Sequence, residues 1–179
     1  LLRGRKATAR IGRTIATACA GGTQVDAACL KVKTAGGEVE AQLTTRNAMC
    51  MTLFQLLQHP EQWRALVADP DGLKKKASEE GLRYEPVVSG IPRVAIEDMA
   101  VEGYLIPGGA MMAVSLLSVL RDPDVYANPD SFDIHRTDQQ RWHLAFGAGA
   151  HRCAGEALAR VELEEVLAAI ARLAPNTRI

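Results

Sequence analysis

A ten-residue segment at 146–155, FGAGAHRCAG, combines one cysteine with three glycines. Gly147 and Gly149 let the backbone pass close to a flat ligand. Cys153 directly precedes a segment of helical periodicity, and both the positive end of a helix dipole and the neighbouring Arg152 favour its thiolate over its thiol. A thiolate is the form that binds a metal, and a haem iron with one thiolate ligand and one open face is arranged for cleavage of an oxygen–oxygen bond. The residue types and spacing therefore indicate a haem-binding loop with Cys153 as the iron ligand.

Three other interpretations of this loop stay open from the residues alone. A lone cysteine before a helix is most often a small buried core residue. A phosphate-binding loop needs a third glycine, where Arg152 stands, and a clear strand before it. A zinc site would use His143, His151 and Cys153, but no fourth ligand is obvious and the histidines do not follow a familiar finger spacing.

Helical periodicity predicts the elements that position the loop. Helices are expected at 44–58, at 60–68 and from a cap at Asp71 to about residue 84, with prolines at their boundaries. Gly81 is expected to weaken the third helix by about 1 kcal/mol relative to alanine. The clearest helix covers 153–174. It carries one apolar stripe, Leu163, Val166, Leu167, Ile170 and Leu173.

Short strands are predicted between Val87 and Val114, where apolar residues alternate between turn signals. Residues 122–141 are rich in proline and polar residues, which predicts a long irregular loop of a kind that is uncommon unless functional. Many helices and few strands give a mainly α fold with a small β-sheet, α+β in class.

The residues Phe146, Gly147, Gly149, His151, Cys153 and Gly155 closely resemble the haem-binding signature of the cytochrome P450 family, with the histidine common in bacterial members. The following helix is similar to the last long helix of that family. The resemblance covers about 44–179, the carboxyl-terminal part of such a protein. It implies an incomplete cytochrome P450-like fold that binds haem b through Cys153.

Two further groups of residues match the same family. Glu80 and Arg83 match its E-x-x-R element, which implies a buried network with Arg136 that pins the long loop against the helix. By physics alone, the first two are helix-surface neighbours worth a few tenths of a kcal/mol. The resemblance also implies that Arg93 and His143, with His151, face the haem propionates, which are carboxylates in need of positive or donor groups.

Thr44 falls at the family's proton-relay threonine and is the catalytic residue that the resemblance implies. Leu43 stands at the position of the family's acid, and Glu40-Ala41 at that of its Ala-Gly pair. Leucine cannot carry a proton. A non-catalytic remnant that retains only the haem signature therefore remains the alternative to a monooxygenase.

The first part of the chain differs in composition from the rest. Residues 1–35 hold seven Lys or Arg and a single acid, Asp26, while the first aromatic residue is Phe54. Without aromatic residues to stack on bases, a solvated or poorly ordered tail is favoured over a nucleic-acid-binding arm. We expect an atypical basic segment at 1–43 and the haem-binding part at 44–179. We hypothesise that the first segment comes from a truncated, mispredicted or frame-shifted gene, which reading the upstream DNA in all frames would test.

The expected activity is that of a haem-thiolate monooxygenase, which inserts one oxygen atom of dioxygen into a small organic substrate. The resemblance implies that a ferredoxin or reductase supplies two electrons. No run of 18 or more apolar residues occurs, and the four cysteines show no C-x-x-C spacing. These features predict a cytoplasmic protein with no membrane or nucleic-acid partner.

Overall fold

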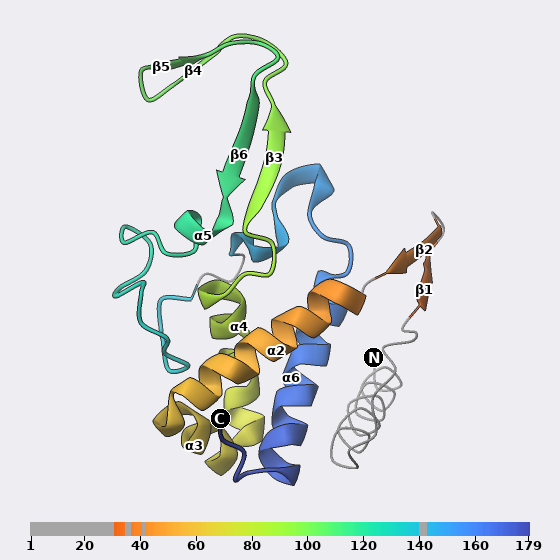
Figure 1. Ribbon diagram of the computed structural model, residues 1–179, viewed down its shortest axis with the longest axis vertical. Coiled ribbons are helices and arrows are strands. Elements are labelled where there is room, and N and C mark those ends of the chain that lie inside the picture. The colour runs from red at the N-terminus through yellow and green to blue at the C-terminus, as the bar shows by residue number, and fades with distance from the viewer. Residues whose placement is uncertain (1–30, 35–36, 41, 140–142) are drawn as a thin grey trace.

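The described chain is mostly helical, with strands confined to two-stranded ladders (Figure 1). The computed structural model describes residues 31–34, 37–40, 42–139 and 143–179. Its helices are α2 (Gln42–Gln58), α3 (Pro60–Ala68), α4 (Pro70–Tyr84), the single turn α5 (Leu116–Val119) and α6 (Glu156–Leu173). Two short 3-10 turns, η1 (Leu144–Phe146) and η2 (Gly149–His151), lie between α5 and α6. The mainly α fold with small sheets that the sequence predicts is confirmed.

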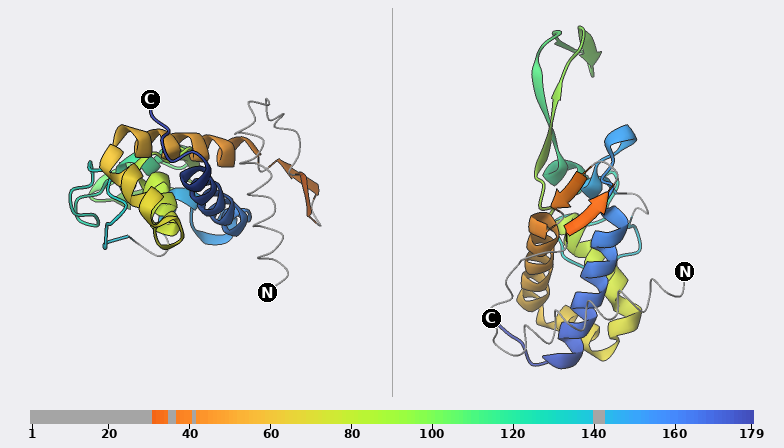
Figure 2. Two further views of the ribbon diagram at one scale, coloured as in Figure 1. Left: turned by 90° about the horizontal axis from the view of Figure 1, so that it is seen from below. Right: turned by 90° about the vertical axis from the view of Figure 1, so that its right-hand side faces the viewer.

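Helices α2, α4 and α6 lie side by side and form the body of the molecule, with α3 packed across one end (Figures 1 and 2). Their shared core is apolar. It contains Leu56, Trp63, Leu66, Ala77, Phe132, Ile134, Leu167 and Ala171. The indole Nε1 of Trp63 donates to the carbonyl of Pro175 at 2.9 Å, which fixes the segment after α6 against α3. Burying such side chains is the main stabilising contribution to a bundle of this size.

Two local expectations are corrected at the helix ends. The cap of α4 is Asp69, whose carboxylate accepts from the Gly72 amide at 2.9 Å, whereas Asp71 lies in the first turn. Proline at position 70 suits the first helical residue, so the helix begins earlier than the spacing to Asp71 suggests. At the C-terminal end of α6, beside the start of α4, Leu173 is 58% exposed although it continues the apolar stripe.

Gly81 allows α4 to pack closely against α2. From the sequence alone, it is expected only to weaken the helix. A Cβ built there would lie 2.1 Å from Oγ1 of Thr52 on α2. Such a distance is far inside van der Waals contact, so α4 approaches α2 closely only because position 81 carries no side chain. The cost in helix propensity is offset by this close packing.

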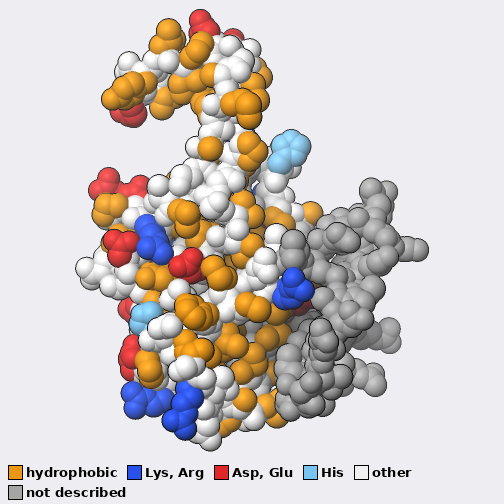
Figure 3. Space-filling view, in the orientation of Figure 1, with side chains coloured by type: hydrophobic (Ala, Val, Ile, Leu, Met, Phe, Trp, Pro, Cys, Tyr) orange, Lys and Arg blue, Asp and Glu red, His pale blue; other side chains and the backbone are white. Residues whose placement is uncertain are grey.

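The strands form three antiparallel ladders. β3 (Gly90–Val94) pairs with β6 (Met111–Ser115), and β4 (Met99–Val101) pairs with β5 (Tyr104–Ile106), together forming an arm that projects away from the helices (Figure 1). Apolar side chains gather on this arm, among them Ile96 and Met111 (Figure 3). A third ladder joins β1 (Lys31–Thr34) to β2 (Gly37–Glu40), where the sequence predicts no regular structure. The remainder of the basic segment, residues 1–30, 35–36 and 41, lies outside the described residues.

Within residues 121–139, the irregular segment that follows α5 is anchored to the helices at several buried residues. Tyr126, Phe132 and Ile134 are buried, and the carbonyl of Phe132 accepts from Nε2 of Gln62 at 3.0 Å. Across the described ranges, no helix is both long and apolar enough to cross a membrane.

Candidate functional site

The cysteine loop, residues 143–155, joins the irregular segment to α6. Gly147 and Gly149 take φ values of 74° and 76°, a left-handed backbone that side chains disfavour. The amide of Cys153 donates to the carbonyl of Phe146 at 3.0 Å and closes the loop on itself. Space is open where a Cβ on Gly149 would stand. The glycines therefore set the path of the backbone and leave one surface of the loop clear.

Cys153 lies near the end of the loop and is accessible to solvent. It is a free, exposed cysteine, two residues before the N-cap of α6 at Gly155. Its exposure contradicts the interpretation of Cys153 as a buried core residue. The zinc interpretation is not supported either, since the described residues contain no group of three His, Cys, Asp or Glu placed to hold a metal ion.

Arg152 points to the first turn of α6. Its guanidinium forms two bonds with the Glu156 carboxylate, at 2.6 and 2.7 Å, and donates to the Gly147 carbonyl at 2.9 Å. The bonds from Arg152, helped by the charge of Arg160, hold the pKa of the Glu156 carboxyl below its ordinary value. In turn, the hydrogen bond to Glu156 raises the pKa of Arg152, and the charge of Cys153 acts in the same direction. Arg152 thus braces the loop and adds positive charge beside the thiol.

His143 is buried and has a carboxylate partner. Its side chain has no solvent exposure, and its Nε2 lies 2.7 Å from Oε2 of Glu79 on α4. Its Nδ1 accepts from the Ala145 amide at 3.3 Å, at the start of η1. Both ring nitrogens of His143 therefore have partners within the protein. Its place beside the haem propionates stays a prediction of the resemblance.

Arg93 and His151 remain on the surface near the open side of the loop. Arg93 is an exposed residue of β3, where its Nη1 donates to the preceding carbonyl of Pro92 at 2.8 Å. β3 is close to the loop, because a Cβ on Gly147 would lie 3.7 Å from Cδ1 of Ile91. His151 ends η2 and is also exposed. Both side chains are accessible to an anionic group.

Thr44 lies in the first turn of α2 and is exposed, while the adjacent Thr45 is buried. It therefore belongs to a different element from the cysteine loop. Leu43 precedes it within the same helix.

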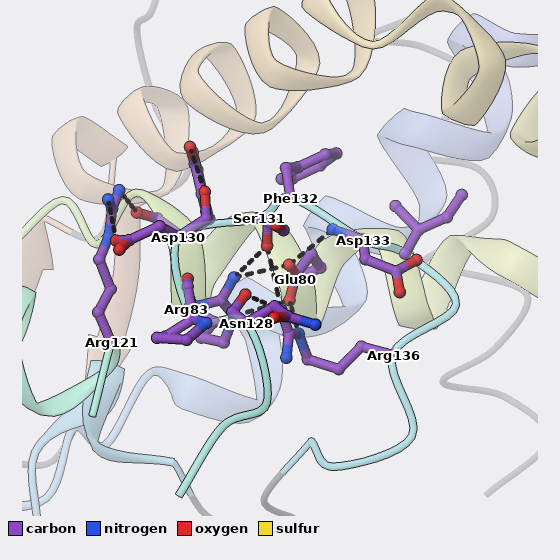
Figure 4. Close-up of polar contacts among 12 residues, drawn as sticks. Glu80, Arg83, Arg121, Asn128, Asp130, Ser131, Phe132, Asp133 and Arg136 are labelled. Carbon is purple, nitrogen blue, oxygen red and sulfur yellow. Dashed lines mark hydrogen bonds and ion pairs between the residues drawn. The ribbon is translucent and has the colours of Figure 1, made fainter. Parts of the chain in front are cut away.

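A second cluster lies between α4 and the irregular segment (Figure 4). Glu80 and Arg83 are both fully buried, and Nε and Nη2 of Arg83 each donate to the Glu80 carboxylate at 2.8 Å. Nε of Arg136 lies 3.3 Å from Oε2 of Glu80. The structure thus brings together the three residues that the sequence resemblance links, and in the bidentate arrangement that arginine suits best.

The same cluster also holds the backbone of the irregular segment. Arg83 donates to the carbonyls of Leu120, Pro129 and Ser131 at 3.0, 2.7 and 2.9 Å. Glu80 accepts from the amide of Asp133 at 2.8 Å. A segment without regular secondary structure has backbone groups that need partners, and these two charged side chains supply them.

The sequence analysis assigns no role to Glu79 or Arg160, although both contact residues of the loop. Nη1 of Arg160 on α6 forms an ion pair with Oε1 of Glu79, and its guanidinium carbon lies 4.9 Å from the centre of the Phe146 ring. A signal was present, because Arg152, Glu156 and Arg160 are spaced four apart and so share one face of a helical register. The partner on α4 has no such local signal.

Comparison with known proteins decides the family. The sequence profile described as Cytochrome P450 matches residues 73–172. The chain belongs to the cytochrome P450 family. It is 47% identical to the plant-inducible Cytochrome P450-pinF1 of Rhizobium radiobacter, over 76% of this chain and 32% of that protein. It is 44% identical to the Vitamin D3 dihydroxylase of Streptomyces griseolus, over 76% of this chain and 33% of that protein.

Solved cytochrome P450 structures agree with this assignment. The crystal structure of P450BioI, bound to an acyl carrier protein that carries hexadec-9Z-enoic acid, superposes with a TM-score of 0.73. The two share 38% identity, over 77% of this chain and 35% of that one. The chain spans about a third of the length of the curated relatives it matches. Members of the cytochrome P450 family bind haem b.

Proposed function

We propose that this chain holds haem b through the thiolate of Cys153. The observation that carries the proposal is the exposed, unpaired cysteine on an open glycine loop at the start of α6. A flat ligand fits that surface, because a Cβ on Gly149 would meet nothing within 4 Å. The positive end of α6 and the guanidinium of Arg152 favour the thiolate.

Other residues of the loop have distinct roles in this proposal. Gly147 and Gly149 would let the backbone pass close to the ring, and at Gly155 a Cβ would lie 3.8 Å from Sγ, so glycine leaves that space beside the sulfur open. The ring of Phe146 packs against His143 and Arg160. Arg93 and His151, both exposed, are the donors that would receive the propionates.

Bound in this way, a haem with a thiolate ligand supplies oxygen activation. We propose that the whole protein is a monooxygenase that inserts one oxygen atom into a small organic substrate, with electrons from a ferredoxin or reductase, in the cytoplasm. Within this scheme the exposed hydroxyl of Thr44 would move a proton, as the family resemblance implies. Leu43 lacks a titratable group for that task, so another donor must supply the proton to Thr44.

A reduced carbon monoxide difference spectrum tests the haem-thiolate proposal. The haem-loaded chain is expected to show a strongly red-shifted Soret band that disappears in Cys153→Ser. Cys50→Ser is the matched control, because Cys50 is also a free and exposed cysteine but lies on α2. A red-shifted band that survives in Cys153→Ser, or an absence of haem retention by the unaltered chain, contradicts the proposal.

The position of Leu43 favours a second candidate, a non-catalytic remnant that retains the haem signature. The two candidates differ in substrate-independent oxygen consumption. A monooxygenase given reduced ferredoxin consumes dioxygen at a rate that Cys153→Ser abolishes, whereas a remnant gives the same low rate with either residue.

A further inference from the structure

Five charged or titratable side chains form a continuous chain from the end of the cysteine loop back to its beginning. Arg152 contacts Glu156 at 2.6 Å, and Glu156 contacts Nη2 of Arg160 at 3.1 Å. Arg160 pairs with Glu79 on α4, and Glu79 contacts Nε2 of His143 at 2.7 Å. His143 is the first residue of the loop and Arg152 directly precedes Cys153. The contacts therefore connect the start of the loop with the residue before the cysteine. We propose that this chain, named here the loop clamp, positions Cys153, a role that rests on the proposed haem ligation.

The clamp holds the loop through two hydrogen bonds with its backbone and one pair between side chains. His143 accepts from the Ala145 amide at 3.3 Å, at the start of η1. Arg152 donates to the carbonyl of Gly147 at 2.9 Å, in the middle of the loop. The bonds from Arg152 to Glu156 then fix the residue next to Cys153 on the first turn of α6. A thiolate ligand must stay in one place for its metal, and these contacts restrict the backbone that carries it.

Phe146 couples the clamp to the amide of Cys153. Its ring stacks on His143 with centroids 6.4 Å apart, and the guanidinium of Arg160 lies 4.9 Å from its centre. The Phe146 carbonyl accepts the hydrogen bond from the Cys153 amide at 3.0 Å. His143 and Arg160 therefore hold Phe146, whose carbonyl accepts the hydrogen bond from the Cys153 amide.

Burial makes the clamp stronger than ordinary surface ion pairs. The side chains of His143, Glu156, Glu79, Arg160 and Arg152 are 0%, 11%, 13%, 16% and 24% exposed. Solvent screening is reduced at such positions, and bidentate arginine pairs add geometric specificity. Loss of one link leaves a partly buried charge without its partner, so the links depend on one another.

The same helix pair offers a matched control. Nζ of Lys74 on α4 lies 2.8 Å from Oε1 of Glu165 on α6. Lys74 lies five positions before Glu79 on α4, and Glu165 lies five positions after Arg160 on α6. Each separation is about 7.5 Å at about 1.5 Å per residue. Glu79→Gln and Glu165→Gln therefore remove the same charge from the same interface, but only the first touches the loop.

Amide hydrogen exchange of the haem-free chain tests the clamp without requiring haem. In Glu79→Gln we expect the peptide covering 143–153 to exchange about tenfold faster, with little change at 167–171 in the core of α6. Glu165→Gln is expected to leave the loop peptide unchanged. Equal acceleration of the loop in both variants, or none in Glu79→Gln, overturns the proposal.

A second variant covers the case in which Glu79→Gln loosens the whole bundle, seen as faster exchange at 167–171. Arg152→Lys keeps the charge and leaves the pair between α4 and α6 in place, but a lysine cannot form the bidentate contact with Glu156. Faster exchange confined to the loop in Arg152→Lys supports the clamp, and an unchanged loop overturns it.

A spectroscopic measurement extends the test to the haem-loaded chain. The red-shifted carbon monoxide band of Glu79→Gln is expected to convert to the unshifted form about tenfold faster than that of Glu165→Gln. Equal conversion rates overturn the positioning role. If the unaltered chain shows no such band, the proposed haem ligation fails, while the exchange experiment still decides whether the clamp holds the loop.

Discussion

Replacing Glu80 with glutamine should remove a large fraction of the stability of this chain. Four N–H donors surround the carboxylate, from Nε and Nη2 of Arg83, the Asp133 amide and Nε2 of Gln139, at 2.8 to 2.9 Å. An amide has only one oxygen, so its NH2 group must face donors. Glutamine would also leave the fully buried Arg83 guanidinium without its anion, whereas the nearby Arg136 would keep its pair with Asp138.

The expected loss is about 3–5 kcal/mol, the cost of breaking a buried ion pair by removing one partner. Single domains have only about 5–15 kcal/mol of unfolding free energy, so this is a large fraction. Urea denaturation followed by far-ultraviolet circular dichroism measures it. Glu165→Gln, which breaks the partly exposed pair with Lys74, should cost less than about 1 kcal/mol. A loss below about 1 kcal/mol in Glu80→Gln would refute the assignment of this cluster as the anchor of the irregular segment.

Three further predictions concern the helices. Gly81→Ala should lower the unfolding free energy by about 1–3 kcal/mol because its Cβ would overlap Thr52, and a gain in stability in the same urea experiment would contradict the packing role. Glu162→Gln should raise the unfolding free energy at neutral pH, since burial raises the pKa of the Glu162 carboxyl, which has an oxygen without a partner. Because the ionised form is the disfavoured one, this gain should appear as pH rises above 4.5, the ordinary value, and thermal melts at two pH values would detect it. For Glu156 the effect of pH on stability is the opposite, because its pKa is lowered, chiefly by Arg152. Its stabilising contribution to the unfolding free energy is present above pH 4.5 and is lost as pH falls through the pKa of the folded state. Glu156→Gln should therefore flatten the acid limb of the melting profile, and an unchanged limb would contradict the link to Arg152.

The helices of this chain could be read from the sequence because their signals are local. Prolines at 60 and 70 begin α3 and α4, and Leu56 and Leu66 fall on buried faces as their spacing predicts. Spacing is less informative at the helix ends. Leu173 continues the apolar stripe of α6 yet is 58% exposed, because spacing predicts the apolar face of a helix and not how far other elements cover that face.

The cysteine loop illustrates the same division. Its glycines and the helix after Cys153 are visible in the sequence, since the left-handed backbone at Gly147 and the helix dipole follow from residues close together in the chain. The partner of His143 is not visible there. Glu79 lies 64 residues away, and only the packing of α4 beside the loop brings the two within 2.7 Å.

By itself, the sequence determined which segments are helical, where the glycine loop turns and which cysteine it presents. These properties depend on backbone preferences and on spacings of a few residues. Only the tertiary structure decided that Glu80 and Arg83 form a buried pair instead of a solvated one, that Arg136 joins them, and that Glu79 links Arg160 to His143. Each of these contacts needs a charge to leave water, and that cost is met only where packing brings the opposite charge and its hydrogen-bond partners to the same place.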